Sequence, residues 1–199
     1  DSASTFFNPL VETNAVTGEL FEPEEGEQYE VGVKYTPTFV DGLFTLSAFD
    51  LTRRNVLTAS APTPHNPFPS NEQTGEVRSR GVELEARVNI TENFRATAAF
   101  TAYDLEITED ANPALVGKTP TIVPEVMASL WADYTFRGDE WYDGVSSGGG
   151  VRYLGSSWAD EENTLKVPDA TLLDLKIGYT RDNWGVDLNV TNVFDKTYA

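Results

Sequence analysis

The stretch Leu173-Asp-Leu-Lys-Ile-Gly-Tyr-Thr-Arg-Asp-Asn-Trp-Gly-Val-Asp-Leu-Asn-Val190 decides the fold class of this chain. Apolar and polar side chains alternate along both of its halves, and the segment Arg181-Asp-Asn183 interrupts the alternation once. Successive side chains of a β-strand point to opposite faces. The pattern therefore predicts two strands joined by a tight turn, each with one apolar and one polar face.

The same period of two recurs along the 199-residue chain, and no window keeps the spacing and caps of a normal helix. We expect eight strands, at residues 27–35, 43–57, 74–89, 94–107, 124–136, 145–155, 168–180 and 184–194. The predicted fold class is all-β, an antiparallel up-and-down meander of about eight long strands. Several strands exceed the ~9–11 residues that cross a bilayer.

Two local points stay open. In residues 43–57, the set Leu43, Thr45, Phe49 and Leu51 competes with the set Phe44, Leu46 and Ala48 for the apolar face. In residues 74–89, the alternation would place Arg78 and Arg80 on the same face of the strand as the apolar Val82. Either a bulge lies near Gly81, or this end of the strand has left the apolar environment.

The connections between the predicted strands alternate in length. The short ones are 36–42, 91–93, 137–144 and 181–183, and the long ones are 58–73, 108–123 and 156–167. Successive connections of a meander lie at opposite ends, so one end should carry all the short turns, as in outer-membrane barrels. Aromatic residues, which favour a membrane interface, cluster beside those turns and predict a girdle. They are Tyr35, Phe44, Phe94, Tyr134, Phe136, Trp141, Tyr142, Tyr179 and Trp184.

Composition excludes several function classes. The chain has 32 Asp and Glu against 14 Lys and Arg, a net charge of -18, which disfavours nucleic acid as a partner. It has no Cys and one His, so disulfides, thiolate metal sites and a multi-His zinc site are ruled out. Acidic clusters lie toward the long connections but lack the spacing of a calcium loop. We interpret them as solvated loops and expect neither a metal site nor a cofactor.

If Tyr29, Val31 and Val33 face lipid, the opposite face becomes a polar inner wall. That wall would comprise Glu30, Lys34, Glu83, Glu85, Arg87, Asp133, Asp174, Lys176, Asp187 and Asn189. The run Gly148-Gly149-Gly150 precedes a strand and not a helix, so it is not a phosphate loop. We expect a curved strand or a close backbone approach there.

Four segments, taken together, resemble the C-terminal part of the barrel of TonB-dependent outer-membrane receptors, in particular the ferrichrome-type siderophore receptors. They are FEPEEGEQYEVGVK (21–34), QTGEVRSRGVELE (73–85), GKTPTIVP (117–124) and NVTNVFDKTY (189–198), and the resemblance covers essentially the whole chain. It implies a 22-stranded transmembrane barrel filled by a plug domain. It also implies TonB-dependent uptake of a ferric siderophore, of the hydroxamate type, across the bacterial outer membrane.

The resemblance also implies a domain organisation and a set of partners. Residues 1–199 would form a single segment of the barrel, without the plug domain, the earlier strands and the last strand. The partners would be the ferric siderophore, the plug and remaining strands, outer-membrane lipid, and the TonB complex through the absent N-terminal part. Open strand edges in lipid are costly, so this segment should pair with strands outside it, or with a second copy of itself.

Three residues in the long connections are candidate ligand contacts: His65, Phe68 and Trp158. Siderophore pockets of the resembled family are lined by aromatics, whereas the alternatives are an exposed loop residue for His65 and local packing for Phe68 and Trp158. Nothing orients His65 as a catalytic triad requires, so we do not expect an enzyme. The competing hypothesis for the whole chain is a soluble β-sandwich that binds carbohydrate through its aromatics.

Overall fold

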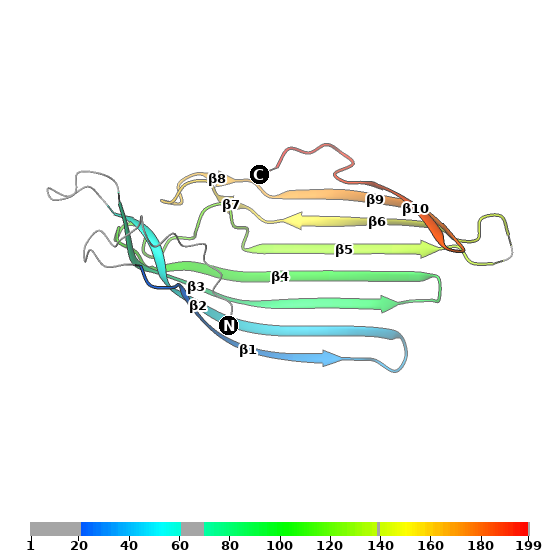
Figure 1. Ribbon diagram of the computed structural model, residues 1–199, viewed down its shortest axis with the longest axis horizontal. Helices are drawn as coiled ribbons and strands as arrows, with labels where there is room; N and C mark the ends of the chain where they lie inside the picture. The colour runs from blue at the N-terminus through cyan, green and yellow to red at the C-terminus, as the bar shows by residue number, and fades with distance from the viewer. Residues whose placement is uncertain (1–20, 61–69, 139, 199) are drawn as a thin grey trace.

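The computed structural model describes residues 21–60, 70–138 and 140–198, and its main element is one eight-stranded antiparallel sheet of order β1-β2-β3-β4-β5-β6-β9-β10 (Figure 1). The strands are β1 (Glu25–Tyr35), β2 (Asp41–Ser60), β3 (Ser70–Asn89), β4 (Phe94–Glu109), β5 (Val126–Thr135), β6 (Val145–Leu154), β9 (Ala170–Arg181) and β10 (Trp184–Val190). This confirms the predicted all-β meander. Within the described ranges, no helix is long and apolar enough to cross a membrane.

A two-stranded ribbon, β7 (Ser157–Trp158) with β8 (Lys166–Val167), lies in the connection between β6 and β9 and was not predicted. Strands of two residues are too short to show a period. The prediction was also wrong about the end of the last strand, which stops at Val190 and not at residue 194. Asn192 adopts a left-handed φ of 50°, and its amide donates to Asp174 Oδ1 at 2.8 Å, which turns the chain away from the sheet.

The connections separate by length as predicted. In Figure 1 the turns between β1 and β2, β3 and β4, β5 and β6, and β9 and β10 all lie at the right-hand end. The long connections lie at the left-hand end, and β2 and β3, with 20 residues each, reach furthest toward it. One end of the sheet therefore carries tight turns, and the other carries extended strands and loops.

The register of β2 answers the question about its apolar face. Phe44 pairs with Tyr35, Leu46 with Val33, and Ala48 with Val31. Directly paired residues of an antiparallel ladder lie on the same face. The second of the two competing sets therefore belongs to the apolar face, and Leu43 and Thr45 belong to the polar one.

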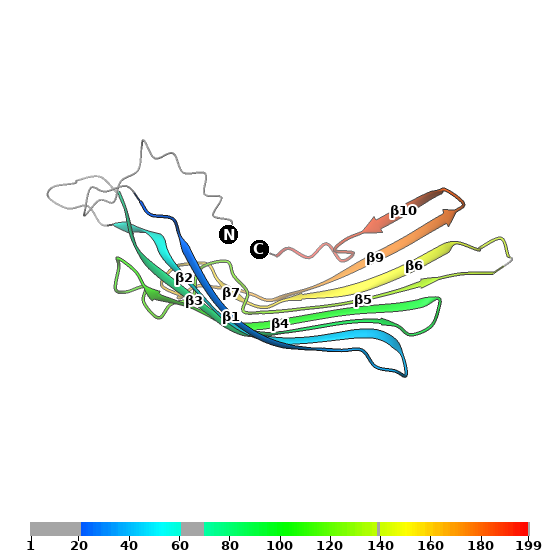
Figure 2. The ribbon, with the colours of Figure 1, turned by 60° about the horizontal axis from the view of Figure 1, so that its bottom comes forward.

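The apolar face is unusually exposed for a folded sheet. Val31 is 73% exposed and Leu188 61%, and among described residues the buried hydrophobic side chains are only Ala170 and Leu172. The sheet is a single curved layer (Figure 2), and within the described residues no second large sheet packs on it. A β-sandwich would bury its apolar faces between two sheets, so that alternative is wrong. An apolar face of this extent is what lipid covers in a transmembrane barrel.

The apolar face ends at a row of charged residues. The ladders of β3 with β2 and β4 run through Gly81 without a shift, so no bulge lies there. Arg78 Nε instead donates to Asp50 Oδ1 at 2.9 Å, and Arg80 Nη2 lies 3.8 Å from Asp104 Oδ2. The second explanation is therefore correct: this end of the strand lies beyond the apolar region.

The predicted aromatic residues gather at the short-turn end and contact one another. Their ring centroids lie between 4.9 and 6.5 Å apart in the pairs Tyr35–Phe44, Phe94–Tyr134, Tyr134–Phe136, Phe136–Tyr142, Trp141–Tyr142 and Tyr179–Trp184. Trp141 is 83% exposed at the turn between β5 and β6. This end of the sheet matches the interfacial girdle of a barrel.

The glycine run of β6 lies beneath an aromatic ring. A Cβ added to Gly150 would collide with the Trp131 ring and lie 2.8 Å from Leu130 O, and one on Gly148 would lie 3.0 Å from Trp131 Cζ2. Gly149 faces the other way, toward Leu175 Cδ2 at 3.1 Å. The predicted close approach is therefore confirmed, and Trp131 packs flat across the polar face of β6.

The two faces respond differently to a positive charge. In the full-length protein, Leu175→Arg places a cation on the lipid face, at a cost of about 2–4 kcal/mol near mid-bilayer, and should lower the amount of folded protein. Lys176→Arg keeps a cation beside Asp187 on the polar face and should assemble normally. Heat-modifiable migration of outer-membrane fractions measures both, and equal assembly of the two variants would contradict the assignment of faces.

The glycine run gives a second matched pair of variants. Gly150→Ala must displace Trp131 or the β5 backbone, and overpacking of this kind costs about 1–3 kcal/mol. Gly149→Ala is tight only against the end of the flexible Leu175 side chain, with Asp174 O at an ordinary contact distance of 3.5 Å, and should be close to neutral. The apparent thermal midpoint of each full-length variant, measured in detergent at one scan rate, should fall for Gly150→Ala only; a larger fall for Gly149→Ala would show that Trp131 does not constrain this strand.

Candidate functional site

The polar face of the sheet carries a set of charged residues that the register places together. Cross-strand pairing puts all ten residues predicted for the inner wall on the face opposite Val31. Between β4 and β10 these charges are paired within the wall. Ion pairs join Arg95 to Asp133 at 3.0 Å, Arg152 to Asp174 at 2.6 Å and Lys176 to Asp187 at 2.9 Å.

The other half of the wall, on β1 to β3, is different. A hollow of about 380 Å³ there is lined by Glu30, Lys34, Glu83, Glu85 and Arg87, together with Leu43, Thr45 and Ser47. None of these five charged side chains forms an ion pair within the described part of the chain. This half of the wall therefore presents charged groups without ion-pair partners among the described residues, on the inner side of the curve of the sheet.

Two long connections at the other end of the sheet are joined by hydrogen bonds. Asn163 Oδ1 accepts from Thr119 N at 2.8 Å, and Asn163 Nδ2 donates to Thr119 O at 2.9 Å. Ile122 N donates to Trp158 O at 2.8 Å, with Ile122 at a φ of 61°. A β-branched residue in this left-handed region is strained. The connections 110–125 and 155–169 therefore hold each other in one arrangement.

The two hydrogen bonds between Asn163 and Thr119 form a clamp between the connections. Within the second connection, Asp160 organises the turn that carries Asn163. Its carboxylate accepts hydrogen bonds from Thr164 Oγ1 at 2.7 Å and from Leu165 N at 2.6 Å. The hydroxyl of Thr164, followed by these backbone amides, holds the pKa of Asp160 below its usual value. Asp160, the first of the three consecutive acidic residues 160–162, thus has a structural role in this turn that the sequence did not indicate.

The structure places one of the three predicted ligand contacts. Trp158 is half-buried in β7, and Lys166 Nζ lies 5.0 Å from the centre of its ring. His65 and Phe68 lie outside the described residues, so their grouping with Trp158 stays a prediction. Trp158 does not line the cavity that lies between β2, β3, β4 and the two connections.

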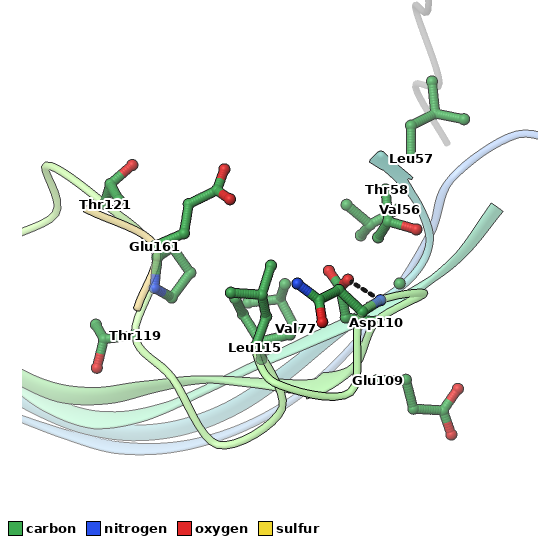
Figure 3. A pocket seen from close by; sticks show the side chains of 14 residues that line it. Val56, Leu57, Thr58, Val77, Glu109, Asp110, Leu115, Thr119, Thr121 and Glu161 are labelled. Carbon is green, nitrogen blue, oxygen red and sulfur yellow. Dashed lines mark hydrogen bonds between the residues drawn. The ribbon is translucent and has the colours of Figure 1, made fainter. Parts of the chain in front are cut away.

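A cavity of about 310 Å³ lies where β2, β3 and β4 meet the two joined connections (Figure 3). Its lining residues are Val56, Leu57, Thr58, Gly75, Val77, Ile107, Glu109, Asp110, Asn112, Leu115, Thr119, Pro120, Thr121 and Glu161. Sequence reasoning missed this cavity, because the apolar residues at the ends of the strands look like ordinary strand positions. Within the described residues, no group of three or more His, Cys, Asp or Glu side chains could hold a metal ion.

A curved sheet with a lipid-compatible outer face, a polar inner wall and long loops at one end defines a segment of an outer-membrane β-barrel. Residues 2–193 match the family model described as "TonB dependent receptor-like, beta-barrel". The chain belongs to this family, whose members are receptors of the outer membrane and not enzymes.

Individual relatives agree with this assignment. The chain is 41% identical over 187 residues to the ferrichrome outer membrane transporter/phage receptor of Escherichia coli strain K12, covering 92% of this chain and 24% of the relative. It is 37% identical to the ferrioxamine receptor of Yersinia enterocolitica, covering 90% of this chain and 25% of that one. A further relative, 38% identical over 99% of this chain and 27% of its own length, is the metal-pseudopaline receptor CntO of Pseudomonas aeruginosa.

Solved structures show the same fold. BauA, the ferric preacinetobactin receptor from Acinetobacter baumannii, superposes with a TM-score of 0.75 at 29% identity, covering 94% of this chain and 28% of BauA. The chain thus spans about a quarter of the length of the relatives it matches.

The clamp between the two connections can be tested by hydrogen exchange. Asn163→Ala in the full-length protein removes both bonds to Thr119 and leaves a non-glycine side chain at a φ of 58°. We expect faster amide exchange in peptides from both connections, although these residues lie 44 positions apart. Asn112→Ala is the control, since among the described residues its side chain bonds only Ala114 N, two residues away. If Asn163→Ala accelerates exchange only around residue 163, the connections are not joined.

Proposed function

We propose that this chain is the C-terminal barrel segment of a receptor that imports a ferric siderophore of the hydroxamate type, with energy from the TonB complex. The observation that carries the proposal is the one sheet with a lipid-compatible face and a polar inner face, in a chain related to ferrichrome and ferrioxamine receptors. Ferrichrome and ferrioxamine are both hydroxamates, and the identities to their receptors support that ligand class.

The charge of the loop end supports the same class. Connections 110–125 and 155–169 carry six carboxylates and two lysines. Three hydroxamates neutralise ferric iron, whereas three catecholates leave the complex with a net negative charge. Like charges repel over the range that screening allows, about 8 Å at physiological salt. An acidic entrance therefore favours a neutral or cationic ferric complex over an anionic one.

The remaining parts of the receptor follow from the same argument. A plug domain inside the barrel would dock against the uncompensated charges of β1 to β3, such as Glu30, Glu83 and Glu85. Further barrel strands would pair with the sheet edges, because unpaired backbone groups in lipid cost several kcal/mol each. The N-terminal part would contact the TonB complex.

Of the three candidate ligand contacts, Trp158 lies within the described residues. We propose His65 and Phe68 as ligand contacts as well. Lys166 Nζ lies 5.0 Å from the centre of the Trp158 ring, in a ribbon at the loop end. A half-buried indole at this end offers an apolar surface of the kind that lines small-molecule pockets.

Uptake assays test the proposed function. The full-length gene, expressed in a bacterial strain that lacks its own siderophore receptors, should restore iron-limited growth with ferrichrome or ferrioxamine B. It should not do so with a ferric tris-catecholate or ferric citrate, nor in a strain without TonB. Growth restored only by a catecholate, by citrate or by a metallophore of the pseudopaline kind would overturn the hydroxamate assignment, and uptake without TonB would overturn the mechanism.

A further inference from the structure

The cavity at the loop end has an apolar floor. Val56 from β2, Val77 from β3, Ile107 from β4 and Leu115 from the connection after β4 meet there. Figure 3 shows Leu115 and Val77 side by side at its centre, with Val56 and Thr58 on one side and Thr121 on the other. Its volume of about 310 Å³ lies at the lower limit of small-molecule sites. A complete ferric trihydroxamate is too large for it, but one aliphatic chain fits.

The rim of this cavity is acidic. Glu161 stands on one side of Leu115 and Asp110 on the other (Figure 3), and no Lys or Arg lines the cavity. Glu161 is exposed and has no ion pair or hydrogen bond within the described residues. Asp110 Oδ1 accepts from Asn112 N at 2.7 Å, which leaves its other oxygen without a partner there. Glu109 also lines the cavity, but its side chain points away from Leu115 in this view.

An apolar floor beneath unpaired carboxylates is complementary to a methylene chain that ends in a cation. The methylenes lose water against Val77 and Leu115, and a terminal ammonium reaches Glu161 or Asp110 at the rim. The clamp at Asn163 preorganises the far wall of the cavity, because Thr119, which it holds, is itself a lining residue.

We propose that this cavity binds a projecting aliphatic arm of the ferric siderophore that ends in a protonated amine. The inference rests on the proposed function, and it adds a selectivity that hydroxamate chemistry alone does not give. A linear trihydroxamate with a free terminal amine is preferred over the same molecule with that amine acetylated. A closed-ring trihydroxamate binds without using the cavity.

The test compares ligands on purified full-length receptor in detergent. Ferrioxamine B carries a free terminal amine, its N-acetyl derivative carries none, and ferrichrome is a closed ring without such an arm. The wild-type protein should bind ferrioxamine B about twofold to fivefold more tightly than the acetylated form, the range of a partly exposed ion pair. Glu161→Gln and Asp110→Asn should reduce this preference and leave the affinity for the acetylated form unchanged.

Two further variants separate the cavity from general electrostatics. Glu162→Gln removes a neighbouring carboxylate that does not line the cavity and should keep the preference. Leu115→Trp fills the floor and should weaken both ferrioxamines without weakening ferrichrome. Equal affinity of the wild-type protein for the free and acetylated amines, or an equal loss of preference in Glu161→Gln and Glu162→Gln, would overturn the inference. A receptor that binds none of the three ferric complexes would overturn the proposed function, and this inference with it.

Discussion

The cross-strand register of one sheet is the constraint on which the other features depend. Two adjacent rows of paired residues cross seven strands, and one is almost entirely apolar while the next is mostly polar. The first contains Tyr35, Phe44, Ala86, Ala98, Leu130, Val151 and Leu173, and the second contains Lys34, Thr45, Glu85, Ala99, Ser129, Arg152 and Leu172. A slip by one residue in any strand would exchange its two faces. It would bring Lys34 or Glu85 into lipid, where a charge is costly.

The register also explains why the loop end can form a binding surface. Beyond the row of Asp50, Arg80 and Asp104 the outward face is charged, so the strands continue above the apolar region as a rigid base. The connections built on this base are fixed by backbone bonds, such as that from Ile122 to Trp158. Binding residues on loops need such support, because a loose loop must lose conformational entropy when a ligand binds.

The sequence predicted much of this arrangement, and its failures have physical causes. Alternation and turn lengths were sufficient for the eight strands, the two faces and the aromatic end. The choice between Leu43 and Leu46 needed the partner strand, since both residues are leucines in one continuous run. The clamp at Asn163 and the cavity around Leu115 depend on contacts between segments distant in sequence, for which a single sequence carries no local signal.

Over the described residues, the inner wall divides into a half whose charges are paired and a half whose charges are not. Between β4 and β10 each basic residue of the wall already has a carboxylate partner, as Arg152 has Asp174. Breaking such a pair to bind a new partner loses the hydrogen bonds within the pair. These residues therefore attract a further charged group only weakly. On β1 to β3 the side chains of Glu30, Glu83 and Glu85 have no such pairs and gain by meeting opposite charge. Within this sheet, β1 to β3 therefore offer more to a group of opposite charge than β4 to β10 do.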